Sequence, residues 1–174
     1  MICYFATMDK KKIKTILNRS LIVLFVGLVI IQVFHPNKNN NPAITSEDIT
    51  KMYPMSDSVH NILAKACYDC HSNNTTYPWY NNIQPIAWWL NDHIEEGKHH
   101  VNFSEFGKYP FTKQAKKLKK CAKEIEEGDM PLDNYLWIHK DAILTPREKQ
   151  LVLDWANNLS QQIAQTAPQQ PAKQ

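Results

Sequence analysis

The sequence contains few of the features that define several common classes of protein. Its 174 residues include only four cysteines, too few and too scattered for a disulfide framework. Alternating apolar runs that would predict β-strands are scarce. Residues 1–38 carry six cationic side chains and one acidic side chain, a net charge of +5. Because the net charge of the whole chain is +3, the remaining residues carry −2. The part of the chain after residue 38 is therefore not a basic domain, and a nucleic-acid partner is not expected.

The most informative pattern that is present is Cys67-Tyr68-Asp69-Cys70-His71. Cys-x-x-Cys-His is the pattern by which haem is attached covalently to protein. The two thiols add across the two vinyl groups of one porphyrin, and the adjacent imidazole reaches the iron. The pattern predicts one covalent haem c, held by Cys67 and Cys70, with His71 as an axial ligand of the iron.

Two other kinds of protein site also use closely spaced cysteines, a structural zinc site and a redox-active cysteine pair. A structural zinc site requires a second Cys or His pair at similar spacing, but only Cys121 and scattered histidines follow. A thioredoxin-like redox pair is expected beside a βαβ pattern, which the sequence does not show. Both alternatives are therefore weaker than haem attachment.

The N-terminus predicts a signal or membrane anchor. A cluster of lysines precedes a nearly unbroken apolar run from Leu21 to Phe34, an order typical of a secretory signal or of an anchor with its N-terminus inside the cell. The run has no polar face, which disfavours a buried core helix. No Ala-x-Ala-like cleavage site follows it, so we expect an uncleaved anchor over residues 1–34. This predicts a single-pass protein of the cell inner membrane whose domain faces the periplasm.

The remaining chain divides into a linker, a domain and a tail. Residues 35–46 are rich in Asn and Pro and predict a spacer, residues 47–160 predict the folded domain, and residues 161–174 predict a disordered tail. Apolar stripes and capping residues predict four helices in the domain. They run from Asp57, capped by Ser56, to Cys70, from Pro85 to just before Gly97, from Thr112 to Glu127, and from the Thr145 capping box to Ile163. The predicted class is all-α, with the general plan of a small c-type cytochrome.

Met130 is the best candidate for the second axial ligand. It lies in Gly128-Asp129-Met130-Pro131, between two predicted helices, and a thioether opposite His raises the reduction potential of haem. His93 is the main rival, because it interrupts an apolar stripe; it can also bind a propionate or be an ordinary core histidine. Met52 and Met55 are weaker candidates. Cys3 and Cys121 have no predicted role.

Several further residues extend the likeness of the chain to a known family. The stretch from Cys67 to Tyr80, Ile83-Gln84-Pro85, Trp89, His93-Ile94, Gly97, Asn102-Phe-Ser-Glu105, Met130-Pro131 and Leu144-Thr145 leading to Trp155 resemble small haem-binding domain proteins common in Bacteroidetes-type bacteria and related to c-type cytochromes. The likeness covers about residues 46–160. It implies a single covalent haem with His71 proximal and Met130 distal. Cys121 has no place in that pattern.

Together these features predict a membrane-tethered, periplasm-facing monohaem cytochrome c that carries single electrons and is not itself an enzyme. Its expected partners are redox proteins, above all membrane oxidoreductases. The alternative is a haem-based sensor or peroxidase-like domain with an open sixth coordination site. A vacant position would bind a diatomic ligand or peroxide, with His93 as a candidate distal base.

Overall fold

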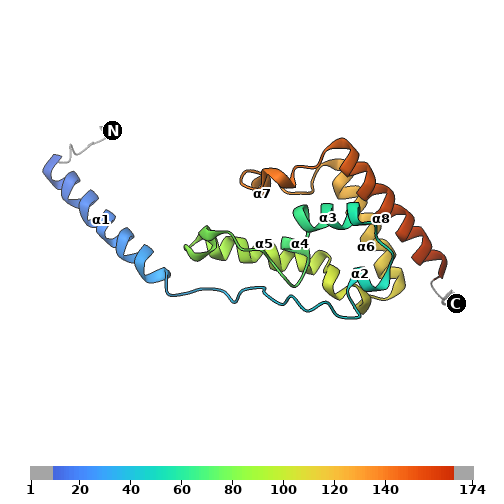
Figure 1. The fold of residues 1–174 in the computed structure, drawn as a ribbon. Helices are drawn as coiled ribbons and strands as arrows, with labels where there is room; N and C mark the ends of the chain where they lie inside the picture. The colour runs from blue at the N-terminus through green and yellow to red at the C-terminus, as the bar shows by residue number, and fades with distance from the viewer. Residues whose placement is uncertain (1–9, 167–174) are drawn as a thin grey trace, which may run out of the picture. The chain divides into compact units, whose positions relative to one another are not determined.

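A computed structural model describes residues 10–166 of the chain (Figure 1). Within this range the protein contains helices and no β-strand, which confirms the all-α prediction. The α-helices are α1 (Lys10–Ile31), α2 (Ile49–Met52), α3 (Asp57–Ala66), α4 (Tyr68–His71), α5 (Ile86–His100), α6 (Phe111–Glu127), α7 (Asp133–Leu136) and α8 (Pro146–Thr166). Three 3₁₀ helices are η1 (Trp79–Asn82), η2 (Phe103–Lys108) and η3 (Lys140–Ala142).

The chain forms two compact units. The smaller comprises Met1–Asn37 and Pro78–Leu90, and the larger comprises Lys38–Tyr77 and Asn91–Gln174, as far as they are described. The predicted division at residues 34 and 46 differs from this one, because Pro78–Leu90 joins the N-terminal segment. In the smaller unit, α1 has 22 residues and buries none of them. The α1 helix is long and apolar enough to cross a membrane. A signal sequence also meets this criterion.

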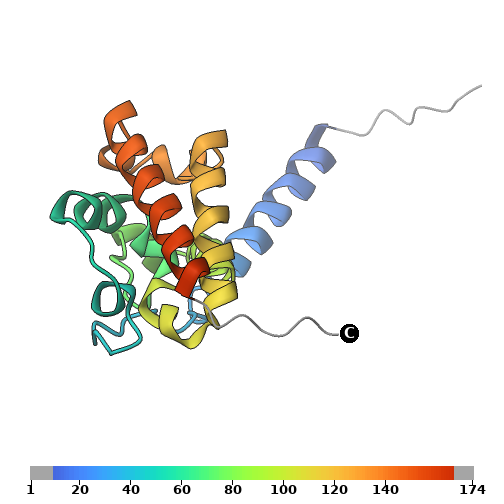
Figure 2. The same ribbon diagram turned by 90° about the vertical axis from the view of Figure 1, so that its right-hand side faces the viewer.

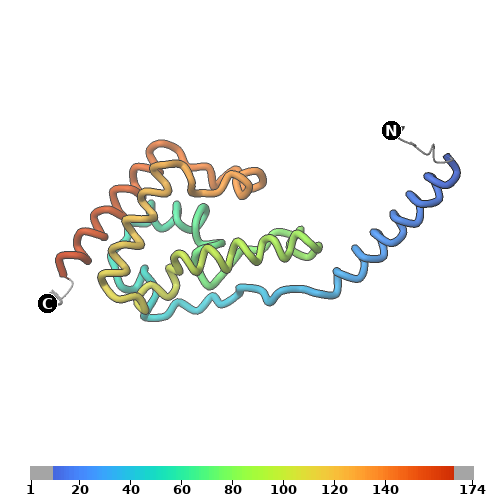
Figure 3. Tube along the Cα trace, turned by 180° about the vertical axis from the view of Figure 1, so that it is seen from behind, coloured from blue at the N-terminus to red at the C-terminus, as the bar shows by residue number. Residues whose placement is uncertain are grey.

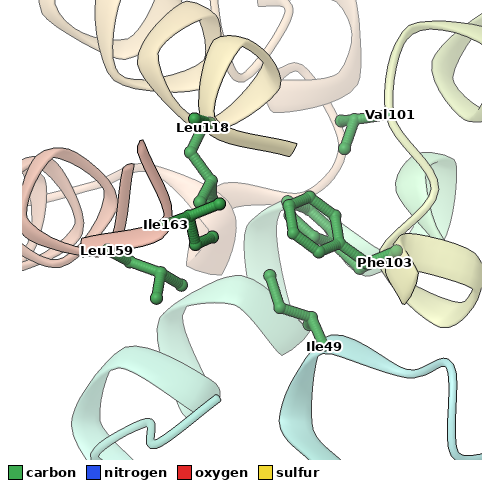
Figure 4. Packing of buried hydrophobic residues seen from close by; sticks show 8 residues of the cluster. Ile49, Val101, Phe103, Leu118, Leu159 and Ile163 are labelled. Atoms are coloured by element: carbon green, nitrogen blue, oxygen red, sulfur yellow. The ribbon is translucent and has the colours of Figure 1, made fainter. Parts of the chain in front are cut away.

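The larger unit is built around α6 and α8, which run antiparallel and side by side (Figures 2 and 3). The hydroxyl of Ser160 on α8 donates to the carbonyl oxygen of Ala115 on α6 at 2.8 Å, and this bond is buried. Apolar residues from α2, η2, α6 and α8 meet beside the pair (Figure 4). The labelled members of this cluster are Ile49, Val101, Phe103, Leu118, Leu159 and Ile163.

The predicted helix ends are mostly confirmed, because local signals set them. Ser56 accepts a hydrogen bond from the Val59 amide at the start of α3. Thr145 and Glu148 bond each other's backbone amides at the start of α8, which is the reciprocal capping box. Gly128 ends α6 with φ +85°, a conformation that glycine adopts without steric cost. The sequence signals therefore located the helices that frame the larger unit.

Three predicted ends differ from the structure. The helix predicted from Asp57 to Cys70 ends at Ala66, because Cys67 leaves the helical conformation with φ −129°. The α5 helix continues through Gly97 to His100, because Gly97 packs closely against another part of the chain rather than ending the helix. The α8 helix continues to Thr166, beyond the predicted start of the tail at residue 161. Ile163 is 1% exposed in the core, and its burial offsets the entropy cost of ordering this last turn. Cys3 and the tail residues 167–174 lie outside the described residues.

The predicted spacer 35–46 is also bound more tightly than its composition suggests. Asn39 contacts the chain that follows the Cys-x-x-Cys-His motif: its side chain donates to the Ser72 carbonyl at 2.8 Å, and its backbone amide donates to the Tyr77 hydroxyl at 2.7 Å. Asn41 donates from its backbone to the Asn73 carbonyl at 2.8 Å. Asparagine side chains bond backbone groups readily in irregular segments. An Asn-rich sequence is therefore compatible with an ordered, extended segment.

Candidate functional site

The motif Cys67–His71 lies at a break between two helices. Cys67 has φ −129° and ψ −41°, so α3 ends before it and α4 starts after it. Its carbonyl oxygen accepts hydrogen bonds from the amides of Cys70, at 3.2 Å, and His71, at 2.9 Å. The motif thus closes into a single turn. Cys67, Cys70 and His71 all line one cavity of about 300 Å³.

The cavity walls are largely apolar and come from several elements of the larger unit. Typical wall residues are Leu63, Val101, Phe103, Ile125, Val152 and Ala156. A volume of this size is at the lower end for cofactor and ligand sites, which are mostly apolar with a few placed polar groups. The side chains therefore form a hydrophobic chamber around the two thiols and the imidazole.

The ring of His71 is held in a defined orientation. Its Nδ1 atom lies 3.0 Å from the Val101 carbonyl oxygen. A carbonyl only accepts, so Nδ1 carries the proton and Nε2 keeps its lone pair for a metal. The Phe103 ring packs edge-on against the imidazole, with centroids 6.3 Å apart. Burial lowers the pKa of His71, which favours the neutral form that binds metals.

Gly97 allows α5 to approach the motif. A Cβ atom at this position would lie 2.5 Å from the Cys70 carbonyl oxygen, a separation that real side chains do not reach. The obstacle is backbone, which cannot rotate away as a side chain does. Any other residue at position 97 would therefore displace the turn that carries Cys70 and His71.

Met130 lines the same cavity as His71. Its position follows from the end of α6: the amides of Asp129 and Met130 donate to the Glu124 carbonyl oxygen at 2.9 and 3.1 Å. Glycine at the left-handed position 128 permits this turn. The structure thus brings together Cys67, Cys70, His71 and Met130. Ligation of iron by Met130 stays a prediction.

The rival ligand His93 also lines the cavity. Its Nε2 atom lies 3.3 Å from the side-chain nitrogen of Asn134, which belongs to α7. Met52 and Met55 do not line the cavity. Of the candidates predicted from sequence for the second ligand, Met130 and His93 therefore both line the cavity, and His100 lines it as well.

The α7 helix is hydrogen-bonded to the motif Cys67–His71. The hydroxyl of Tyr135 donates to Asp69, between the two cysteines, at 2.9 Å. The other carboxylate oxygen of Asp69 accepts from the Thr76 amide at 2.9 Å. Asp69 thereby links α4 to the chain following Met130, although its position in the motif carried no predicted role.

Several lining residues were not predicted from sequence, among them three on α6. Cys121 lies on α6 three residues after the buried Leu118, and this helical spacing was the available signal. Lys117 and Lys120 line the cavity from the same helix, and Lys117 donates to the His100 carbonyl. Lysines on a helix usually face solvent, so the sequence contained no sign that these two reach the cavity.

The three thiols are held in their neutral form. Burial raises the pKa of Cys67 to about 12 and those of Cys70 and Cys121 to about 11. In the described part of the chain, no group of three or more His, Cys, Asp or Glu side chains is arranged to hold a metal ion.

Trp155 provides a further polar group in the chamber. Its indole Nε1 atom is buried and has no acceptor among residues 10–166, and the side chain lines the cavity. Buried donors normally have a partner. An acceptor on a bound molecule would satisfy it. The charged residues of the lining are Lys117 and Lys120 together with the acidic Asp69, Asp92, Glu96 and Glu124.

Comparison with known proteins agrees with this chemistry. The sequence model of a family described as "Haem-binding domain" matches residues 26–158. No curated protein and no solved structure matches the chain.

Proposed function

This chain belongs to the haem-binding domain family, and from that premise we propose that it is a membrane-tethered c-type cytochrome of the periplasm. One haem is attached to Cys67 and Cys70, with His71 and Met130 as axial ligands. The protein passes single electrons to and from redox partners, chiefly membrane oxidoreductases, and is not an enzyme in its own right. The observation that carries the proposal is the convergence of these four side chains on one chamber.

The residues present fit a haem. When bound, the haem supplies the one-electron chemistry of its iron. The Val101 carbonyl orients the His71 ring, and the apolar walls exclude water. The orphaned Trp155 donor and the lysines of α6 suit the carboxylates of a porphyrin.

The tether is supported by α1. The part of α1 after Lys12, residues 13–31, is about 28 Å long at 1.5 Å per residue, close to a hydrocarbon core of roughly 30 Å. Lys10, Lys11 and Lys12 precede its apolar part, and such a basic flank stays on the cytoplasmic side. The haem domain then faces the periplasm, where haem c is assembled.

The proposal is tested by expressing the chain together with cytochrome maturation machinery and staining a denaturing gel for haem. The wild-type band should stain, whereas Cys67→Ala with Cys70→Ala should abolish the stain. Cys121→Ala is the matched control, because it removes a thiol from the same chamber and should leave the stain intact. A wild-type chain that loses all colour on acid–acetone extraction would contradict covalent attachment.

The second candidate function is a haem sensor or peroxidase-like domain. The presence of His93 in the chamber favours it, because a distal imidazole can serve as a base when the sixth position is open. Rapid binding of carbon monoxide by the reduced wild-type protein would favour this function over electron transfer.

A further inference from the structure

The segment Pro78–Leu90 combines two properties that the haem chamber does not use. No charged residue and no histidine occurs between residues 72 and 91. Five large apolar side chains of the segment are exposed, and they are Trp79, Ile83, Ile86, Trp88 and Trp89. None of these side chains lines the haem chamber. Large exposed apolar side chains in a segment that carries no charged residue indicate an interaction site.

The segment is bonded to the chain that leaves α1. The side-chain amide of Gln32, directly after α1, accepts from the Gln84 amide at 2.9 Å and donates to the Gln84 carbonyl at 3.2 Å. The Phe34 carbonyl oxygen accepts from the Gln84 side chain at 2.7 Å and from the Trp88 indole at 3.0 Å. Gln84 is 2% exposed. These bonds fix Pro78–Leu90 at the C-terminal end of the apolar helix.

We propose that Pro78–Leu90 lies in the headgroup region of the lipid bilayer, as a second membrane contact beside the end of α1. The inference rests on the membrane tether of the proposed function. It adds that the tether is not a single helix on a flexible spacer but a helix with an attached aromatic platform.

The chemistry of the segment matches a lipid interface better than it matches a redox partner. Tryptophan is enriched at membrane interfaces, where its apolar body and polar tip are both satisfied. Trp79 is 76% exposed, and the absence of charges means that no ion is desolvated on insertion. Because residues 13–31 of α1 are about as long as the hydrocarbon core is thick, the residues bonded to the end of α1 are at the depth of the headgroups.

The test uses the full haem-loaded chain in vesicles of phosphatidylethanolamine and phosphatidylglycerol. One photoactivatable lipid carries its reactive group on the acyl chain and another carries it near the headgroup, and labelled peptides are mapped by mass spectrometry. The acyl-chain probe should label α1, and the headgroup probe should label Pro78–Leu90. Trp137, which is 73% exposed in the larger unit, serves as the internal control for exposure alone and should remain unlabelled.

The failures are distinguishable. Labelling of α1 without labelling of Pro78–Leu90 overturns the inference and leaves the tether standing. Absence of acyl-chain labelling on α1 overturns the tether and the inference together. Equal labelling of Trp137 and Pro78–Leu90 shows that the probe follows exposure and overturns the inference. Protection of the segment from protease in native membranes, without labelling in lipid vesicles, assigns it to a membrane protein instead.

A variant pair sharpens the test. Trp79→Ser with Ile83→Ser should reduce headgroup labelling of the segment to the level of Trp137, whereas Trp137→Ser should leave it unchanged. An unaltered haem absorption spectrum shows that the variants are folded. Labelling that is the same as in the wild-type chain would show that these side chains do not contact lipid, and would overturn the inference.

Discussion

The imidazole of His71 donates through Nδ1 to the carbonyl oxygen of Val101, which lies 30 residues further along the chain. Val101 directly follows α5, the helix that Gly97 brings against Cys70. The orientation of the imidazole is therefore set by the end of α5 and not by the motif alone. Partners of this kind commonly fix the ring of a metal-bound histidine.

Gly97→Ala should destabilise the protein and reduce haem attachment. Alanine in a helix gains about 1 kcal/mol over glycine, but a new Cβ would lie 2.5 Å from the Cys70 carbonyl oxygen, and overpacking of this kind costs about 1–3 kcal/mol. The net loss should appear in denaturant unfolding and as weaker haem staining. Glu95→Ala, on the exposed face of the same helix, should change neither; equal effects of both changes would argue against the close packing.

Met130→Ala should open the sixth coordination position. The ferric protein is expected to lose its sulfur-to-iron charge-transfer band, and the reduced protein should become high-spin and bind carbon monoxide rapidly. Met55→Ala is the control, because Met55 packs against the core clusters and does not line the chamber. If the Met130→Ala spectrum matched the wild type, His93→Ala would be the next variant to measure.

Tyr135→Phe should loosen the segment that follows Met130. The change removes the hydrogen bond to Asp69 at a stability cost of about 1 kcal/mol. Exogenous imidazole should then displace the sixth ligand faster than in the wild-type protein. Tyr53→Phe removes a hydroxyl that donates to Gln114, away from the chamber. It should cost similar stability without changing that rate, and a matching acceleration in both variants would contradict the prediction.

Glu148→Gln should destabilise the fold at neutral pH but not in strong acid. The bonds that Glu148 forms with Lys65 and Thr145 lower its pKa from 4.5 to about 2. A lowered folded-state pKa contributes stability above pH 4.5 that is lost as pH falls toward about 2. We expect a loss of about 1 kcal/mol at pH 7, typical of a helix cap, and convergence with the wild type in acid. Glu126→Gln, exposed on α6, should show no such pH dependence.

The sequence predicted the long helices of the larger unit because their signals are local. Ser56, Thr145 and Gly128 mark helix ends through contacts within a few residues. The short helices α2 and α7 were not predicted, since four residues are too few to show a period of 3.6. Tertiary packing rather than local propensity holds such short elements.

The candidate site was predictable only in part for the same reason. Cys67, Cys70 and His71 form a contiguous motif, and Met130 follows a helix end with a glycine, so both could be identified from neighbours in sequence. The Val101 partner of His71, the Tyr135 partner of Asp69 and the approach of Cys121 depend on how α5, α6 and α7 pack. Contacts between distant segments leave no periodic trace in the sequence.

The position of Cys121 bears on the order of maturation. A chain that folded first would present three sulfur nucleophiles in one enclosure to a molecule with two reactive vinyl groups, and regiochemical errors would follow. An extended chain offers an adjacent pair at residues 67 and 70, with the third sulfur more than fifty residues away in sequence. If haem is attached covalently as proposed, attachment before α6 docks would avoid this competition between thiols.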